Sequence, residues 1–168
     1  MVYKRYTIYD QKNDEYKEYI KNHVDNVKKA LDEIINKLSH EIIECLNTDT
    51  LIRNVLEHDQ SKYSVEEFEA YRKKFYPIDD DEKNNFDEEE FEIAWKHHYE
   101  NNPHHPEFWK KEPMPIEYVI EMVCDWEAMS YVFGGSAVEH YEKKKEHIRN
   151  KLHPDTVVLL EKVLDNLR

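Results

Sequence analysis

The sequence contains few of the residues that interrupt helices. Its 168 residues include only two glycines, Gly134 and Gly135, and six prolines. Glycine and proline are the residues that most strongly disfavour a helix interior. In the segments between these glycines and prolines, apolar residues recur at spacings of three and four, which is typical of amphipathic helices. The sequence therefore predicts an all-α fold, and its length predicts a single compact helical domain over residues 1–168.

Cysteines and long apolar runs are also scarce. Cys45 and Cys124 are the only cysteines, too few for a disulfide framework or a thiolate metal site, which suits a reducing cytoplasm. No stretch approaches the roughly eighteen apolar residues of a membrane-spanning helix, and the N-terminus lacks the apolar segment of a signal peptide. We therefore expect a soluble, cytoplasmic protein with no membrane partner.

Basic residues are outnumbered by acidic ones. The chain has 24 Lys and Arg against 37 Asp and Glu, a net charge of −13. Such a surface repels the phosphates of a nucleic-acid duplex, so we expect no duplex partner. Aromatic residues make up 12% of the chain, whereas disordered proteins are poor in aromatics. The chain is therefore expected to fold.

The apolar periodicity predicts six or seven helices. In chain order they cover residues 14–46 (one helix, or two joined near Ser39), 50–59, 64–75, 86–100, 116–131, 137–150 and 154–164. Ser64 and Glu67 fit a capping box at the start of the third. The acidic segment from Tyr76 to Glu90 is expected to be a solvated connection, because it lacks the glycine and ligand spacing of a calcium loop.

Histidine is abundant, and its placement points to a metal site. The chain has ten histidines; His23 lies four residues before Val27, and the doublet His58-Asp59 follows Val55 by three and four residues. Each of these polar residues therefore lies on or beside an apolar helix face. Imidazole and carboxylate groups are ligands for transition metals, and a helical bundle can direct them from several helices at one centre.

Two further positions follow the same pattern. His98 comes three residues after Trp95 on an apolar line, which favours His98 over His97 as the inward-pointing member of that doublet. Asp125 shares a helix face with Met122. A carboxylate on an apolar face needs a partner, and a cation would provide one.

In chain order, these residues resemble the HD-domain superfamily of metal-dependent phosphohydrolases. The family order H, HD, H, HH, D is matched by His23, His58, Asp59, His98, His104, His105 and Asp125. The segment HDQSK, residues 58–62, is similar to the HD-x-G-K form of the signature, with Ser61 for glycine and Lys62 as the lysine. The whole chain also resembles an uncharacterised family of short bacterial and phage proteins that carries HHY…N.HHPE.W, here residues 97–109, and EM..DW.AM, here residues 121–129.

The resemblance implies one or two divalent transition-metal ions, with Mn, Fe, Zn, Co and Ni as candidates. The implied ligands of the first ion are His23, His58, Asp59 and Asp125, and those of a second ion are Asp59 as a bridge, His98, and His104 or His105. Lys62, one turn beyond Asp59, is placed to meet a phosphate as a point charge. Glu121, one turn before Asp125, is a candidate for orienting a ligand or a water.

The resemblance also implies the reaction. The expected activity is hydrolysis of a small phosphorylated molecule, a nucleotide being one candidate, by a metal-activated water with Asp59 and Lys62 as catalytic residues. Two alternatives stay open at this point. One is a redox-active di-iron oxygenase on the HD scaffold. The other is an acidic helical binding protein whose histidines hold a structural metal or none.

Overall fold

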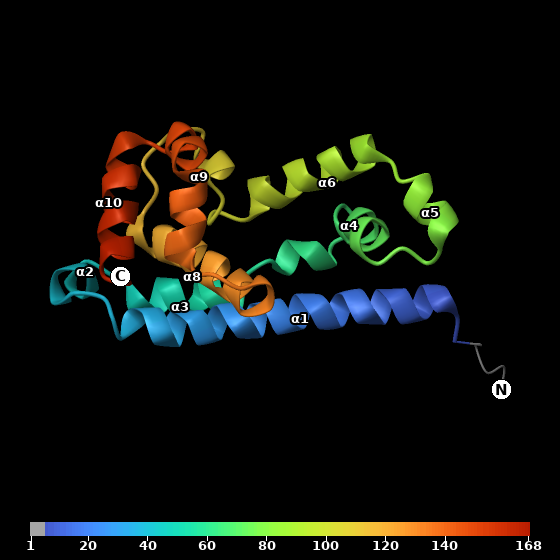
Figure 1. The fold of residues 1–168 in the computed structure, drawn as a ribbon, viewed down its shortest axis with the longest axis horizontal. Coiled ribbons are helices and arrows are strands. Elements are labelled where there is room, and N and C mark those ends of the chain that lie inside the picture. Colours follow the sequence, from blue (N-terminus) through green and yellow to red (C-terminus); the bar gives the residue numbers. More distant parts are fainter. Residues whose placement is uncertain (1–5) are drawn as a thin grey trace. The chain divides into compact units, whose positions relative to one another are not determined.

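The structure is a computed structural model that describes residues 6–168, and this part of the chain is all helical (Figure 1). The helices are α1 (Ile8–Ile35), α2 (His40–Glu44), α3 (Thr48–Leu56), the 3-10 helix η1 (Gln60–Tyr63), α4 (Phe68–Phe75), α5 (Asp80–Asn84), α6 (Glu88–Asn101), α7 (Pro106–Trp109), α8 (Ile116–Phe133), α9 (Ala137–Lys151) and α10 (Pro154–Asp165). The predicted all-α class is confirmed. Seven α-helices have eight or more residues and overlap the seven expected segments. Helix α2 begins directly after Ser39 within the first expected segment, which is therefore two helices, while α5 and α7 add short helices of five and four residues.

The chain divides into two compact units. The first, here called the α4–α6 unit, comprises residues 6–22 and 59–101 of the described chain; the second, the α8 unit, comprises residues 23–58 and 102–168. Helix α1 contributes its first part to one unit and its second part to the other, and the boundary also falls between His58 and Asp59. The expectation of one domain over residues 1–168 stays a prediction.

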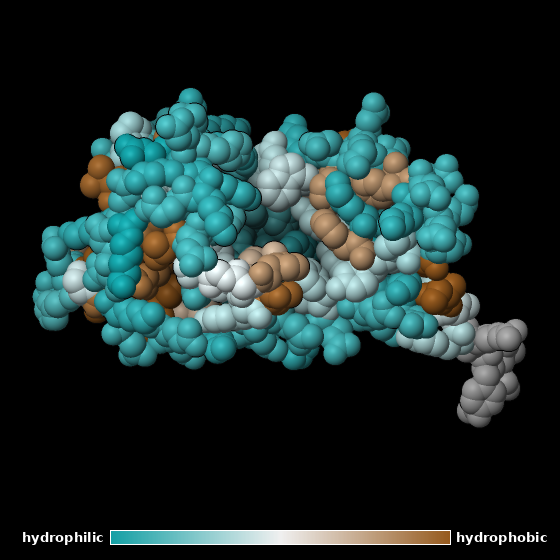
Figure 2. All heavy atoms as spheres, in the orientation of Figure 1, coloured by the Kyte–Doolittle hydropathy of each residue, from teal (hydrophilic) through white to brown (hydrophobic). Residues whose placement is uncertain are grey.

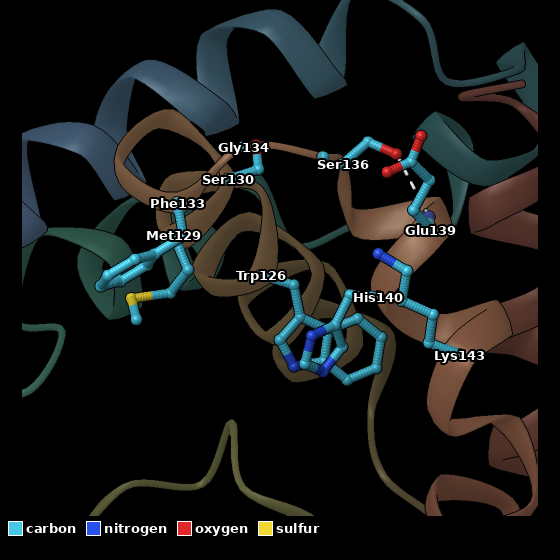
Figure 3. A pocket seen from close by; sticks show the side chains of 10 residues that line it. Trp126, Met129, Ser130, Phe133, Gly134, Ser136, Glu139, His140 and Lys143 are labelled. Atoms are coloured by element: carbon cyan, nitrogen blue, oxygen red, sulfur yellow. Dashed lines mark hydrogen bonds between the residues drawn. The ribbon is translucent and has the colours of Figure 1, made fainter.

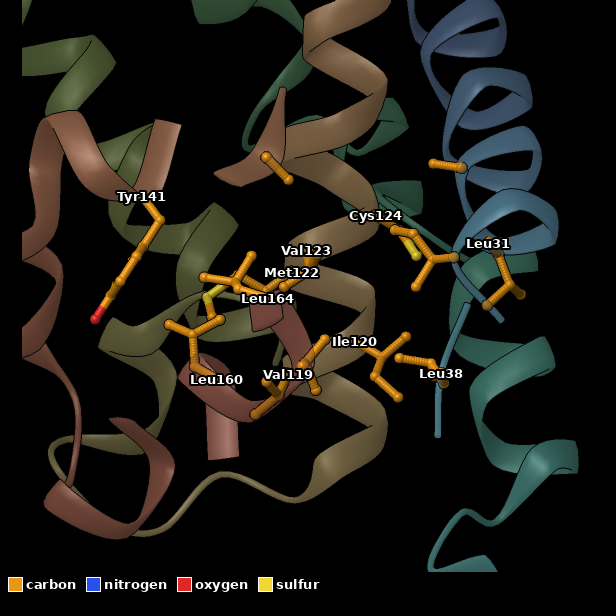
Figure 4. Packing of buried hydrophobic residues seen from close by; sticks show 14 of the residues in the cluster. Leu31, Leu38, Val119, Ile120, Met122, Val123, Cys124, Tyr141, Leu160 and Leu164 are labelled. Atoms are coloured by element: carbon orange, nitrogen blue, oxygen red, sulfur yellow. The ribbon is translucent and has the colours of Figure 1, made fainter. Parts of the chain in front are cut away.

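Helix α8 is the centre of the α8 unit. It packs against α3, α9 and α10, and all six residues from Val119 to Cys124 are buried. A helix that is buried on every side must have neighbours all round it. Figure 4 shows this: Leu160 and Leu164 of α10 lie on one side of α8, and Leu31 and Leu38 lie on the other. Polar side chains on α8 are therefore held by a closely packed, rigid element.

The α4–α6 unit has its own smaller core. Its buried members come from α1, α4 and α6, and they are Tyr16, Ile20, Ala70, Tyr71 and Ala94. Helices α4 and α6 pack against each other. The Tyr16 ring lies 5.1 Å from the ring of Phe68 and 5.8 Å from that of Tyr76. Offset and tilted ring pairs at such distances add to the stabilisation from burial.

The sequence led us to expect a solvated connection from Tyr76 to Glu90, but this acidic segment also contains regular structure. It contains the short helix α5, whose N-cap Asp79 accepts a hydrogen bond from the backbone of Glu82 at 2.8 Å. The Glu82 carboxylate in turn accepts from the buried guanidinium of Arg72 at 2.8 Å. The pattern of acidic residues hides this turn because an ion pair, and not an apolar face, holds it in place.

The expected capping box at Ser64 and Glu67 is also wrong. Helix α4 begins at Phe68, and Glu67 is its N-cap without a side-chain cap hydrogen bond. The Glu67 carboxylate is used by two histidines of α6, described below. A buried acceptor that satisfies two ring donors is worth more than a cap at a solvated helix end.

Most of the face of the molecule drawn in Figure 2 is hydrophilic. Within residues 6–168, none of the helices combines the length and the apolar character needed to cross a membrane.

Candidate metal centre

Glu121 is the buried acceptor at the middle of the α8 unit. Its Oε1 atom lies 2.9 Å from Nδ1 of His58 and 3.2 Å from Nδ1 of His104. Burial favours the neutral acid, but the hydrogen bonds from His104 and His58 outweigh it and hold the pKa of Glu121 below its usual value. An ionised carboxylate only accepts hydrogen bonds, so each ring donates from Nδ1. Both histidines are thereby fixed in the tautomer whose Nε2 carries the lone pair.

Asp125 lies one turn beyond Glu121 on α8. Its Oδ1 atom is 3.0 Å from Nε2 of His23 and 3.9 Å from Nε2 of His58. Burial alone would raise the pKa of Asp125, but the hydrogen bond from His23, with the nearby rings of His58 and His104, lowers it. Asp125 is therefore an anion that faces imidazole nitrogens.

The donor atoms in this cluster are close enough to share one ion. Atoms of His58, His104 and Asp125 all lie within 4.8 Å of one another, and His23 reaches the same carboxylate oxygen. The rings pack closely, with centroids 5.3 Å apart for His23 and His58 and 4.2 Å apart for His58 and His104. Imidazole nitrogens plus one carboxylate suit Zn, Mn, Fe, Co or Ni. A carboxylate behind two ligand histidines, as Glu121 is here, is the usual support of such a site.

A second histidine and carboxylate cluster lies in the α4–α6 unit. Glu67 is fully buried, and its two oxygens lie 2.7 Å from Nδ1 of His97 and 2.8 Å from Nδ1 of His98. The Nε2 atom of His98 is 3.3 Å from Oδ1 of Asp59. Burial lowers the pKa of His98, but the Asp59 and Glu67 carboxylates outweigh it and raise that pKa overall.

Asp59 has an unusual backbone for a residue with a side chain. Its φ of 57° lies in the left-handed region, where aspartate is tolerated better than most residues at some cost in strain. The sequence predicted a helix over residues 50–59 that would include His58 and Asp59. Helix α3 ends at Leu56 instead, so both residues lie beyond it. The Asp59 carboxylate, 3% exposed, forms an ion pair of 2.7 Å with Nζ of Lys62.

The structure groups the candidate residues by unit. His23, His58, His104 and Asp125 come together in the α8 unit, and Asp59, Lys62 and His98 come together in the α4–α6 unit. His98 is buried and His97 is about one-third exposed, as the spacing predicts. His104 lies beside His58 and Asp125 of the implied first set, and its assignment to the second set of ligands stays a prediction. The sharing of one ion by Asp59 and His58 stays a prediction.

Glu67 has a role in these clusters that the sequence did not reveal. Glu67 satisfies both members of the His97-His98 doublet. The signal that could have found it is the doublet itself, because two adjacent ring donors near a core require an acceptor. His105, half-buried, packs its ring 4.2 Å from that of His104 and stands at the start of α7; its role as a ligand stays a prediction.

Comparison with known proteins gives a family but no activity. No curated protein and no solved structure matches the chain. One family model matches residues 12–166, and so includes every candidate site residue from His23 to Asp125. Since this match covers nearly the whole chain, the protein belongs to the family of unknown function DUF5662.

Proposed function

We propose that the chain is a metal-dependent phosphohydrolase that acts on a small phosphorylated molecule. The observation that carries the proposal is the Glu121 carboxylate, which holds Nδ1 of both His58 and His104. This arrangement fixes the two Nε2 lone pairs beside the ionised Asp125. Any buried imidazole N–H needs an acceptor, but here the acceptor takes Nδ1 of both rings and so leaves Nε2 of both rings as the lone-pair atom on the side of Asp125. The order of these residues in the chain, which resembles that of HD-domain phosphohydrolases, supports the same reaction.

A divalent transition metal bound here would supply an acidified water as nucleophile and polarise a phosphoryl oxygen. The protein's own residues orient and balance this site. His23 donates to Asp125, which keeps that carboxylate ionised. Glu121 prevents His58 and His104 from rotating, so their nitrogens need no reorganisation when an ion binds. One aspartate and neutral imidazoles leave a dication with net positive charge, which favours an anionic substrate.

Asp59 and Lys62, in the α4–α6 unit, are the proposed catalytic residues. Lys62 is a cation in a chain of net charge −13, and its ammonium is fixed 2.7 Å from Asp59. A fixed cation offers phosphate a point charge without the entropic cost of ordering a flexible side chain. Asp59 positions that ammonium and also faces Nε2 of His98, and it is the proposed acid and base group of the reaction.

The first experiment measures metal and activity together on tag-free protein, because a histidine tag would add false ligands. Metal content by plasma mass spectrometry is compared for the native chain, Asp125→Ala, and His147→Ala, an exposed histidine of α9 that serves as the matched control. We expect one or two transition-metal ions per chain in the native protein and the control, and fewer in Asp125→Ala. Hydrolysis of p-nitrophenyl phosphate and bis(p-nitrophenyl) phosphate is then assayed with Mn, Zn, Fe, Co and Ni.

Three outcomes contradict the proposal. A chain that neither carries nor takes up metal would be a helical binding protein and not an enzyme of this kind. Metal that is bound without hydrolysis of either ester would leave a structural site. Iron that gives an oxygen-dependent absorption band, with no hydrolysis under any metal, would favour the oxygenase alternative.

A further inference from the structure

A cavity of about 250 Å³ opens between the end of α8 and the start of α9 (Figure 3). Its walls come entirely from the α8 unit. Apolar and aromatic side chains of α8 form one wall, from Trp126, Met129 and Phe133, while α9 contributes His140 and Lys143. A concave, mostly apolar pocket with a few polar groups is the usual form of a small-molecule site.

Two consecutive glycines shape the rim of this cavity. Gly134 and Gly135 have φ angles of 81° and 91°, which residues with side chains rarely adopt. They turn the chain from α8 into α9, where Ser136 caps the new helix. A Cβ at Gly135 would lie 2.9 Å from a carboxylate oxygen of Glu139, whereas a Cβ at Gly134 would meet nothing within 4 Å. The turn therefore keeps this side of the cavity open.

The aromatic wall presents a flat surface. The rings of Trp126 and His140 lie 4.9 Å apart with 32° between their planes, and they overlap in the view of Figure 3. Burial and the nearby ammonium of Lys144 lower the pKa of His140, so its ring is a neutral imidazole near pH 7. A neutral, half-buried pair of rings offers stacking to another planar ring.

The cation on the other wall, Lys143, is not neutralised by a carboxylate of the described residues. Lys145, Arg149 and Lys151 of α9 each pair with a glutamate, whereas Lys143 and Lys144 form no ion pair within residues 6–168, and of these two only Lys143 lines the cavity. Its side chain lines the cavity together with those of Trp126 and His140. A planar ring with acceptor atoms at one edge could stack on the aromatic wall and accept a hydrogen bond from Lys143.

The cavity adjoins the candidate metal centre along α8. Trp126 directly follows Asp125 in the chain, and Met129 lies one turn beyond Asp125, so residues of the cavity wall are the nearest neighbours of a proposed ligand. Asp125 is also close enough to His140 to influence the pKa of that ring. The Asp125 carboxylate favours a higher pKa for His140, while burial and the lysines lower it overall. The cavity and the candidate metal centre are therefore built on neighbouring turns of the same helix.

We propose that this cavity receives a planar heteroaromatic ring of the phosphorylated substrate, stacked on Trp126 with Lys143 donating a hydrogen bond to its polar edge. The placement of the phosphoryl group at the metal centre rests on the proposed function, whereas the ring site itself does not. The shared chemistry is a flat ring with acceptor atoms, which nucleobases, flavins and pyridine derivatives all offer.

The test measures binding without turnover. The full-length protein in EDTA is titrated calorimetrically with adenosine 5′-monophosphate, riboflavin 5′-phosphate and pyridoxine 5′-phosphate, and with ribose 5-phosphate as the compound that lacks an aromatic ring. We expect at least one ring compound to bind about tenfold or more tightly than ribose 5-phosphate, because stacking on an aromatic side chain contributes about that factor. The identity of the compound that binds tells whether the cavity takes a nucleobase, a flavin or a pyridine derivative.

The variants come in matched pairs. Trp126→Ala should weaken binding of the ring compound about tenfold, whereas Trp126→Phe, which keeps an aromatic face, should lose much less. Lys143→Ala should weaken it too, while Lys144→Ala, the neighbouring lysine outside the cavity wall, should not. The inference is overturned if no ring compound binds better than ribose 5-phosphate, or if Trp126→Ala and Trp126→Phe bind alike. Ring binding by a chain that hydrolyses no phosphate ester would overturn only the proposed function.

Discussion

One oxygen of Glu121 lies 2.9 Å from Nδ1 of His58, and both residues are almost completely buried. The same oxygen is 3.2 Å from Nδ1 of His104. A single carboxylate thus fixes two imidazole rings that come from separate segments of the chain. Because the carboxylate is itself on the central helix α8, the geometry of the candidate centre depends on the best-packed element of its unit.

Replacing this carboxylate should weaken metal binding more than folding. In Glu121→Gln the amide keeps the shape of the side chain but can no longer act as an ionised acceptor for both rings. We expect metal affinity to fall by about 10- to 100-fold, the usual effect of losing such a support, as measured by competition with a chelating dye. Glu146→Gln, on the exposed side of α9, is the control. Equal affinities in the two variants would contradict the assigned role of Glu121.

The metal-free protein should lose stability in acid through Asp125. Its pKa is lowered in the folded state by His23 and its neighbours, so the ionised group stabilises the fold above its ordinary value of 3.8. That contribution declines as the pH falls below about 3.8 towards the lower folded value. In Asp125→Asn, unfolding by urea at several pH values should show a flatter dependence below about pH 4. If the free energy of unfolding of Asp125→Asn changed with pH as steeply as that of the native protein, the lowered pKa of Asp125 would be contradicted.

The overall helix pattern and most candidate residues were predictable from the sequence because they follow apolar periodicity. Asp125 and His98 stand on apolar lines, and the structure places both at buried clusters. Glu67 was missed because its acceptor role depends on a helix thirty residues away. Helix α5 was missed because the ion pair of Arg72 and Glu82 holds it. Contacts between polar groups that are distant in the chain leave no periodic signal.

Loss of the buried guanidinium should unfold the α4–α6 unit at lower denaturant concentration. Arg72 is fully buried and donates to both Glu69 and Glu82, so Arg72→Met leaves two carboxylates without their partner. We expect a loss of about 3 kcal/mol in the free energy of unfolding, measured by urea denaturation. In the double variant Arg72→Met with Glu82→Gln, the second change should cost less than it does alone, because the pair is already broken. Simple additivity of the two changes would contradict the pairing.

Asp59 offers a test that separates catalysis from folding. Asparagine is also tolerated at positive φ, so Asp59→Asn should keep the left-handed turn after α3 while removing the charge that fixes Lys62. We expect the helical content at the assay temperature to be retained, while the melting temperature falls because Lys62 loses its buried partner. Phosphatase activity should fall by about two orders of magnitude, as it does when a positioned acid or base group is lost. Asp49→Asn, an exposed change in the first turn of α3, is the matched control. If Asp59→Asn retained full activity with its metal in place, Asp59 and the ion pair with Lys62 would belong to the turn alone and not to the reaction.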